Sequence, residues 1–277
     1  MTTATGDSSE LLAPVMQRAI AAVATGSRRI VERGPFVAAL DEVDDLVWLS
    51  YVLVRPSTAE SDFDPGHVEA LRAEFTAANR VLRFEIFEQL HPWLADRLTR
   101  CGLKAQGAQP LMLCGPADFR PAAAPAGISV IDLLADAPVE TISHFITTAK
   151  MCFGEPPFAT FAETEAARAG LRRLEVRSAY AAADGGAMVG VGSCVAASGE
   201  LIGVGTLPPF RGRGVAAAVN SRLVAEQFRR GSAAAWLSAA DERARASYRT
   251  IGFRDAGTQL NFIDATWDGR TRACSPV

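Results

Sequence analysis

The chain has 277 residues, of which 49% are hydrophobic and 21% are charged, a composition typical of a globular protein with room for two modest domains. Its formal net charge of −3 argues against a nucleic-acid-binding protein, because phosphate recognition depends on a basic surface. Five cysteines form no CxxC pair, so the sequence indicates neither a disulfide framework nor a zinc site.

The first half of the chain is expected to contain both helices and strands. Its start has no basic segment followed by an apolar run, and no stretch of about 18 apolar residues follows, so we expect a cytoplasmic protein without a membrane span. The pattern of apolar residues predicts a helix over 9–24, strands over 36–40 and 46–54, a helix opened by Pro65, a strand over 81–87, a helix between Pro92 and Gly102, and a strand over 110–114.

A proline- and alanine-rich stretch over 118–127 is the predicted linker, and a second set of helices and strands follows it. The order of elements favours an α/β (α+β) fold with a mixed central sheet flanked by helices. We expect domains over 1–120 and 128–265, joined by a linker at 121–127 and followed by a tail at 266–277. The predicted elements of the second half are a strand over 128–134, a helix from Pro138, a helix over 164–177, strands over 178–184, 187–196 and 200–207, a helix over 213–230, a strand over 234–239, a helix over 242–251 and a strand over 259–263.

The two halves resemble each other at a shift of 150 residues. The segment 101–104 (Cys-Gly-Leu-Lys) aligns with 251–254 (Ile-Gly-Phe-Arg), and the predicted strand over 83–87 falls on 233–237. The order of the predicted elements agrees as well. We therefore expect two related copies of one fold in tandem.

A glycine-rich turn at 204–216 is the strongest local signal for chemistry. A strand ends in two prolines and turns through Gly212 and Gly214 into a helix. Glycines let backbone N–H groups approach an anion closely, and a helix N-terminus carries about half a positive charge, so the turn suits a pyrophosphate. It matches neither the G-x-G-x-x-G fingerprint nor the P-loop, which disfavours a nucleotide hydrolase. The residues expected at the phosphates are Arg211, Gly212, Arg213, Gly214, Val215, Ala216 and Ala217.

A second motif lies downstream at 237–253. Asp241 is a predicted helix cap, a short helix carries Tyr248, and Gly252 ends that helix. Taken alone, these residues describe an ordinary strand–helix unit.

Together the two motifs resemble the GNAT superfamily of acetyl-CoA-dependent N-acetyltransferases. The family signature, Arg/Gln-x-x-Gly-x-Gly/Ala, is matched by Arg211, Gly214 and Ala216, and the resemblance extends over most of 127–265. It implies that Tyr248 is the general acid toward the CoA thiolate. Asp241 stands where the family has an asparagine that contacts CoA.

The resemblance also implies roles for the strand before the turn. Backbone groups of Val204, Gly205 and Thr206, at the position where the family's strands splay apart, would pair with pantetheine and polarise the thioester carbonyl. Transfer to an amine needs the neutral amine, which a base helps to provide. Glu200, eleven positions before Arg211, is where histone-type members place that base; it is alternatively a turn residue after Ser198-Gly199.

We expect an enzyme that transfers an acetyl group from acetyl-CoA directly to the amine of a small molecule or peptide in a ternary complex. A non-catalytic acyl-CoA-binding regulatory module is the alternative, and a longer acyl donor stays open. No metal is expected, because His67, His91 and His144 share no ligand spacing. Nor are nucleic-acid or membrane partners expected. The chain is predicted to be a monomer with an internal pseudo-dimer, or a homodimer.

The N-terminal copy is predicted to be degenerate. At the shift of 150 residues, the glycine turn corresponds to 61–66, where Asp62 and Asp64 would repel a pyrophosphate and Pro65 lacks an N–H donor. Tyr248 corresponds to Leu98, which has no proton to give. One acetyl-CoA per chain is therefore expected.

Overall fold

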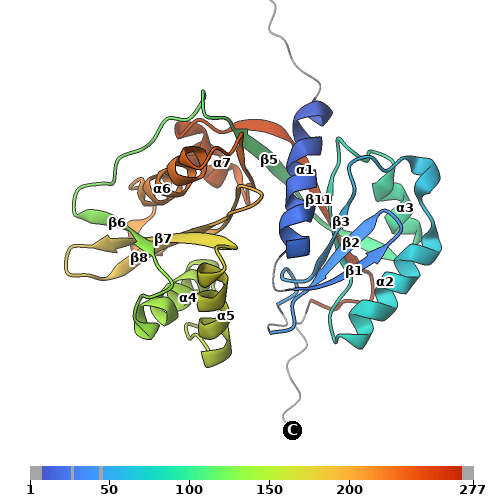
Figure 1. Cartoon of the computed structure of the whole chain (residues 1–277), viewed down its shortest axis with the longest axis horizontal. Helices are drawn as coiled ribbons and strands as arrows, with labels where there is room; N and C mark the ends of the chain where they lie inside the picture. Colours follow the sequence, from blue (N-terminus) through green and yellow to red (C-terminus); the bar gives the residue numbers. More distant parts are fainter. Residues whose placement is uncertain (1–7, 26–27, 44–45, 270–277) are drawn as a thin grey trace, which may run out of the picture. The chain divides into compact units, whose positions relative to one another are not determined.

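The computed structural model describes residues 8–25, 28–43 and 46–269. They form two compact units, one built from residues before 112 and after 255, and the other from residues 112–255. Figure 1 shows the helices and strands of both units. None of the described helices has the length and apolar character needed to cross a membrane.

Unit 1 is a mixed sheet with strand order β1-β2-β3-β4-β11-β5. Strands β3 and β4 are parallel, whereas β1–β2, β2–β3 and β4–β11 are antiparallel. Its elements are α1 (Ser8–Thr25), β1 (Arg29–Arg33), β2 (Phe36–Leu40), β3 (Tyr51–Val54), the 3-10 turn η1 (Glu60–Asp62), α2 (Pro65–Ala77), β4 (Arg83–Phe87), α3 (Leu94–Arg100), β5 (Leu103–Cys114) and β11 (Arg254–Asp264).

In unit 2 the strands follow in the order β5-β10-β9-β8-β7-β6, again with parallel and antiparallel pairs. Strands β9 and β10 are parallel, and β6–β7, β7–β8 and β8–β9 are antiparallel. Its elements are β6 (Ile128–Leu133), α4 (Val139–Phe153), α5 (Phe161–Arg172), β7 (Val176–Ala183), β8 (Met188–Val195), β9 (Glu200–Thr206), the 3-10 turn η2 (Pro208–Phe210), α6 (Val215–Arg229), β10 (Ala235–Ser238) and α7 (Glu242–Thr250), together with the end of β5.

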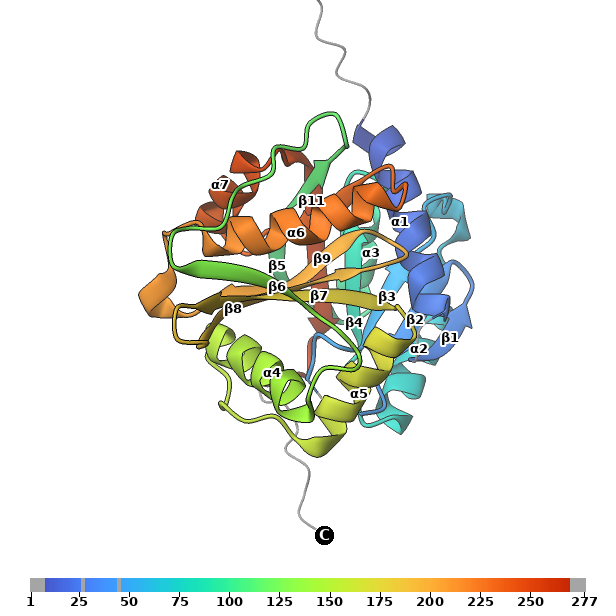
Figure 2. The same cartoon turned by 60° about the vertical axis from the view of Figure 1, so that its left-hand side comes forward.

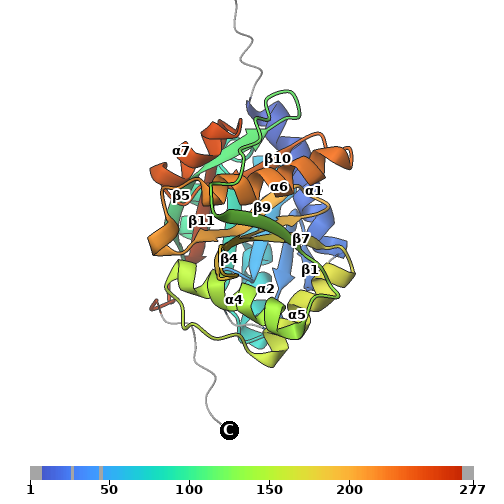
Figure 3. The ribbon, with the colours of Figure 1, turned by 90° about the vertical axis from the view of Figure 1, so that its left-hand side faces the viewer.

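The helices of unit 2 cover both faces of its sheet. Helix α6 lies on one face, and α4 and α5 lie on the other, as Figures 2 and 3 show. Glycines in the strands let α6 approach closely: a Cβ on Gly190 would lie 2.7 Å from Val215 Cγ1, and one on Gly192 would lie 3.0 Å from Val219 Cγ1. The apolar side of α6 therefore packs on the sheet backbone, with Val215, Val219 and Leu223 buried in the core of the unit.

The repeat at 150 residues holds for the folded elements. Helix α2 corresponds to α6, α3 to α7, β3 to β9, and β4 to β10. The last strands also correspond, since 103–114 shifted by 150 gives 253–264, which is β11. Two related copies in tandem are thus visible in the order and type of the elements.

The last strand of each copy lies in the sheet of the other copy. Strand β11, from the second copy, pairs with β4 of the first, with Leu260 opposite Ile86. Strand β5, from the first copy, ends beside β10 of the second. Each copy completes the sheet of the other, so the compact units do not coincide with consecutive stretches of the chain. The division of the sequence into domains over 1–120 and 128–265 stays a prediction.

Several predicted element boundaries are wrong, and one strand was not predicted. Residues 47–49 form a turn, and β3 starts only at Tyr51. The helix expected to reach 177 ends at Arg172, where Leu174 adopts a left-handed conformation with φ of +56°. Strand β1 was not predicted, because arginines at both ends and Glu32 mask its short apolar centre.

The strand exchange predicts that neither half folds well alone. A fragment 128–277 lacks β5, whose Met112 and Cys114 are buried in the core of unit 2, and it leaves Phe262 of β11 without a sheet. A fully buried side chain of this size contributes about 1.5–3 kcal/mol, against a typical total of about 5–15 kcal/mol. Expressed alone, the fragment should be aggregated or oligomeric in size-exclusion chromatography, and co-expression with 1–127 should restore a soluble pair. A monodisperse 128–277 with the parent's melting temperature would contradict the exchange.

Candidate active site

Strands β9 and β10 separate soon after they meet. They pair at a single position, Trp236 opposite Glu200, where the Trp236 N–H donates to the Gly199 carbonyl at 3.0 Å. Beyond that pair, the only strand partner of β9 among the described residues is β8. One edge of the second half of β9 is therefore left without a strand, and the backbone polar groups on that edge, apart from the Thr206 carbonyl bonded by Arg211, are available to a ligand.

The predicted pantetheine-binding residues lie on this free edge. Val204, Gly205 and Thr206 follow Gly203, which has a φ of +60° and lies where the register with β8 shifts. Such a bulge bends a strand, and only glycine adopts this φ without strain. All three residues are half-buried, so the edge lies within reach of solvent.

Helix α4 covers the same strand from one face. A Cβ on Gly205 would lie 2.5 Å from Cys152 Cβ, so this position requires glycine. Burial raises the pKa of the Cys152 thiol to about 11, against the opposing effect of Arg211. Burial likewise raises the pKa of Cys194 to about 12. Both thiols are neutral at pH 7 and are poor nucleophiles.

The glycine turn forms as predicted and leaves the N-terminus of α6 open. Gly212 and Gly214 have φ of +77° and +86°, and the four residues before Val215 are exposed. Gly214 is the N-cap of α6, and no side chain of the described residues caps the helix. The first N–H groups of α6 therefore have neither a helical partner nor a capping group, and this arrangement attracts an anion. Val215 and Ala217 are buried, so only their backbone can face a ligand.

Arg211 ties the turn to its surroundings. Its Nε donates to the Thr206 carbonyl at 2.9 Å, and its Nη2 donates to the Cys152 carbonyl at 3.1 Å. The side chain thus joins the end of β9, the turn and the end of α4. We infer that the motif arginine positions the turn, besides any contact to phosphate.

Arg213 lies in the turn, and Arg243 of α7 lies beside it. The Arg213 guanidinium stands 5.3 Å from the centre of the Phe210 ring, and a Cβ on Gly212 would lie 3.7 Å from Arg243 Nη2. Arg243 was not predicted as a site residue. In the sequence it resembles Arg245 and Arg249 of the same helix, and only the fold brings it to the turn.

Tyr248 lies on α7 with its ring in the core of unit 2 and 9% of its surface exposed. Its ring meets that of Phe253 edge to face, with centroids 5.7 Å apart. Burial raises the pKa of the phenol to about 12, and the neighbouring Asn220 side chain opposes the shift. The hydroxyl therefore keeps its proton throughout the neutral range. Asn220, buried on α6, is a second neighbour that sequence reasoning missed, because a polar residue in a helix gives no signal of where it points.

The other two predicted residues, Asp241 and Glu200, stand at the starts of α7 and β9. Asp241 caps α7, its Oδ1 accepting from the Ala244 N–H at 2.7 Å, which confirms the predicted cap. Glu200 begins β9, at the end opposite to Thr206, and its N–H donates to Ser198 Oγ at 3.3 Å. With a rise of about 3.3 Å per residue, its Cα lies roughly 15 Å or more from that of Gly205.

The corresponding region of unit 1 is closed. The Asp64 side chain caps α2 by accepting from the Gly66 N–H at 2.8 Å, so the carboxylate occupies the place that is open on α6. Phe63 packs between the rings of Phe36 and Trp93, with centroids 6.3 and 6.0 Å away. Leu98, at the position of Tyr248, is fully buried. These contacts support the prediction of a degenerate first copy.

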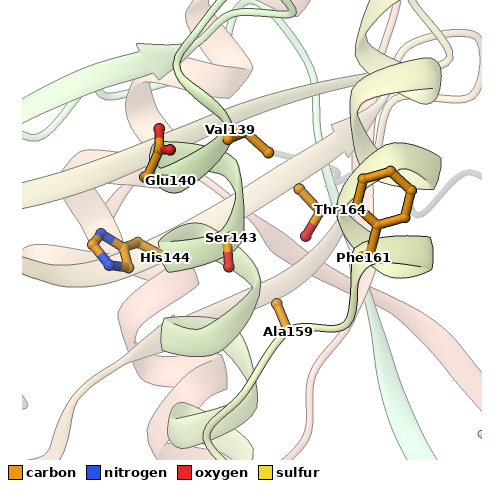
Figure 4. Close-up of a pocket in the computed structure, with 7 residues that line it drawn as sticks. All are labelled: Val139, Glu140, Ser143, His144, Ala159, Phe161 and Thr164. Atoms are coloured by element: carbon orange, nitrogen blue, oxygen red, sulfur yellow. The ribbon is translucent and has the colours of Figure 1, made fainter.

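A separate pocket of about 300 Å³ lies between α4 and α5. Figure 4 shows Thr164 on α5 facing Ser143, with Glu140 and His144 on the side of α4 away from Phe161. None of the predicted site residues lines it. Among the residues that the structure describes, no group of His, Cys, Asp and Glu side chains is arranged to hold a metal ion.

The sequence profile of the Acetyltransferase (GNAT) family matches residues 143–253, which include β9, the glycine turn and Tyr248. This segment is a GNAT acetyltransferase domain. No curated protein matches the chain significantly.

Solved structures extend the GNAT likeness to both units. A GCN5-related N-acetyltransferase from Kribbella flavida is 27% identical, with a TM-score of 0.73 over 95% of this chain and 98% of that one. One from Sphaerobacter thermophilus is 19% identical, with a TM-score of 0.60 over 83% and 76%. A tandem GNAT protein from the clavulanic acid biosynthesis pathway, solved without AcCoA, is 14% identical, with a TM-score of 0.57 over 93% and 96%. The predicted mixed-sheet, GNAT-like tandem fold is confirmed.

The raised pKa of Tyr248 predicts how stability changes at high pH. A phenol ionises near pH 10 in the unfolded chain but near 12 in the fold, so the folded state loses stability as pH rises from 10 to 12. At pH 11 the loss from this residue is about 1.4 kcal/mol. Urea unfolding at pH 9 and 11 should show a smaller decrease for Tyr248→Phe than for the parent. Equal decreases would mean that the hydroxyl titrates normally.

Proposed function

We propose that the GNAT domain transfers an acetyl group from acetyl-CoA to the amine of a small molecule or peptide, directly and in a ternary complex. One observation carries the proposal. The uncapped N-terminus of α6, behind Gly212 and Gly214, lies next to the second half of β9, whose edge away from β8 has no strand partner among the described residues. An anionic group and an extended amide-containing chain could bind side by side there.

The turn supplies the contacts that a pyrophosphate needs. Its backbone N–H groups carry partial positive charge from the helix and, at the glycines, no side chain shields them. Acidic residues are absent from the first turn of α6. The pyrophosphate would be held by Arg211 and by the backbone groups of Gly212, Arg213, Gly214, Val215, Ala216 and Ala217.

The free edge of β9 would bind pantetheine in the manner of a strand. Backbone groups of Val204, Gly205 and Thr206 would pair with the two amides of pantetheine, and an N–H there would polarise the thioester carbonyl. The close packing of Cys152 on Gly205 keeps this segment rigid, and a rigid donor stabilises a developing oxyanion without reorganising.

Tyr248 would assist departure of the CoA thiolate. Because the pKa of its phenol is about 12, complete proton transfer to a thiolate of ordinary pKa, about 8.5, is unfavourable. We therefore propose that the hydroxyl donates a hydrogen bond to the departing sulfur, as a general acid that gives up little of its proton.

The acceptor must lose a proton before it attacks. For an amine of pKa about 10.4, neutrality at pH 7 costs about 4–5 kcal/mol, which a base reduces. Glu200 is the candidate base. Because Glu200 lies far from Gly205 along β9, it would act through water or on a long acceptor. The alternative interpretation, that Glu200 is only a turn residue beside Ser198, stays open.

A non-catalytic acyl-CoA-binding module is the second candidate. The burial of Tyr248 and the position of Glu200 favour it, because neither side chain stands exposed at the turn. Release of CoA from acetyl-CoA in the presence of a panel of amines distinguishes the two functions.

A single charge on α6 tests the cofactor site. Ala216→Glu places a carboxylate in the first turn, where it stabilises a helix but repels a pyrophosphate. We expect the melting temperature to hold and acetyl-CoA binding, measured by calorimetry, to fall from one per chain to none, because unit 1 offers no second site. Ala225→Glu, exposed on the same helix about 13 Å away, is the matched control. Normal binding by Ala216→Glu, or two molecules bound per parent chain, would refute the assignment.

Tyr248→Phe tests the leaving-group role. It keeps the ring in the core and removes only the hydroxyl, so acetyl-CoA affinity should stay within about twofold while turnover falls by roughly 10² or more. Tyr180→Phe, in β7 of the same unit, should leave turnover unchanged. An unaltered rate for Tyr248→Phe, with chemistry shown to be limiting, would remove Tyr248 from the mechanism.

A further inference from the structure

The arginines of α7 differ in how their charge is neutralised. Arg245 and Arg249 each bridge Glu242 and Asp255, at distances between 2.6 and 2.9 Å. Arg243, on the same helix, has no acidic partner within the part of the chain that the structure describes. Its two acidic neighbours in sequence are already engaged, since Asp241 caps the helix and Glu242 bridges the other two arginines.

Arg213, like Arg243, has no acidic partner in the described part of the chain. It is exposed, it contacts the Phe210 ring, and no carboxylate among the described residues pairs with it. Arg213 follows Gly212 directly, and Arg243 Nη2 approaches Gly212 from α7. Two positive charges therefore lie at the turn without a counter-charge from the described residues. Most arginines of this domain are paired, so the arrangement points to an anion supplied by a ligand.

This anion would be additional to the one bound by α6. The first N–H groups of the helix suit a pyrophosphate, whose two phosphates each carry a single charge. CoA also has a phosphomonoester at the 3′ position of its ribose, which carries close to two charges at pH 7. A dianion is better matched by two guanidinium groups than by backbone N–H groups.

We propose that Arg213 and Arg243 bind the 3′-phosphate of CoA and give the domain its preference for CoA over 3′-dephospho-CoA. This rests on the proposed function, since it assumes that the pyrophosphate occupies the turn. Because both side chains are exposed, the preference should be modest, roughly three- to tenfold.

Calorimetric titration with CoA and with 3′-dephospho-CoA tests the proposal. The parent should bind CoA more tightly, and the double variant Arg213→Gln/Arg243→Gln should lose that preference by weakening CoA binding alone. Arg172→Gln is the matched control: it removes one positive charge from an exposed arginine of α5 that has no acidic partner among the described residues, and it should keep the preference. The preference of the parent should also grow from pH 5 to pH 7.5, as the monoester loses its second proton near pH 6.

Three different results would overturn the proposal, and each has its own interpretation. Equal affinity of the parent for both ligands would exclude recognition of the 3′-phosphate. An equal loss of both ligands in the double variant would assign the arginines to the pyrophosphate, with the cofactor site intact. Failure of the parent to bind either ligand would remove the cofactor site itself, and this proposal with it.

Discussion

The candidate site depends on the early end of the pairing between the parallel strands β9 and β10. Had the strands stayed paired beyond Trp236 and Glu200, the backbone groups of the second half of β9 would be bonded within the sheet. A backbone group on such an edge forgoes a hydrogen bond within the sheet, worth about 0.5–1.5 kcal/mol net, so the edge persists only where other contacts hold it. Arg211 supplies one, by bonding the Thr206 carbonyl and reaching α4, and the bulge at Gly203 bends the strand. The structural contacts around the edge and the proposed binding groups on it are therefore parts of one arrangement.

The N-terminus of the helix after the parallel strand is open in one copy and filled by side chains in the other. In unit 1 the helix after the parallel strand is capped by its own Asp64, so its first N–H groups are satisfied within the protein. Aromatic rings, Phe63 among them, occupy the space beside that helix. In unit 2 the cap is Gly214, which has no side chain to offer. With aspartate at this position, the first N–H groups of the helix bond within the protein. With glycine, they remain open to a ligand.

The sequence predicted the features that local chemistry determines. Helix α6, its glycine turn, the cap at Asp241 and the tandem repeat follow from residue types and spacing, and the structure confirms them. The strand exchange could not be predicted, because β5 and β11 have the same local pattern whichever sheet they join. Arg243 was missed for a related reason. Nothing in the sequence of α7 distinguishes it from Arg245. Only its closeness to Gly212, some thirty residues away in the chain, indicates a role at the glycine turn.

The strand exchange also gives a physical reason to keep a silent first copy. All of the proposed cofactor and catalytic residues lie between 200 and 248, within unit 2, so unit 1 supplies none of them. It does supply the end of β5, which completes the sheet beside β10 and buries Met112 and Cys114 in the core that also holds Tyr248. Mutations that close the first site leave this contribution intact, whereas loss of the first copy would leave β10 as an open edge. The first copy can therefore lose its own binding site while its strand β5 is retained by selection.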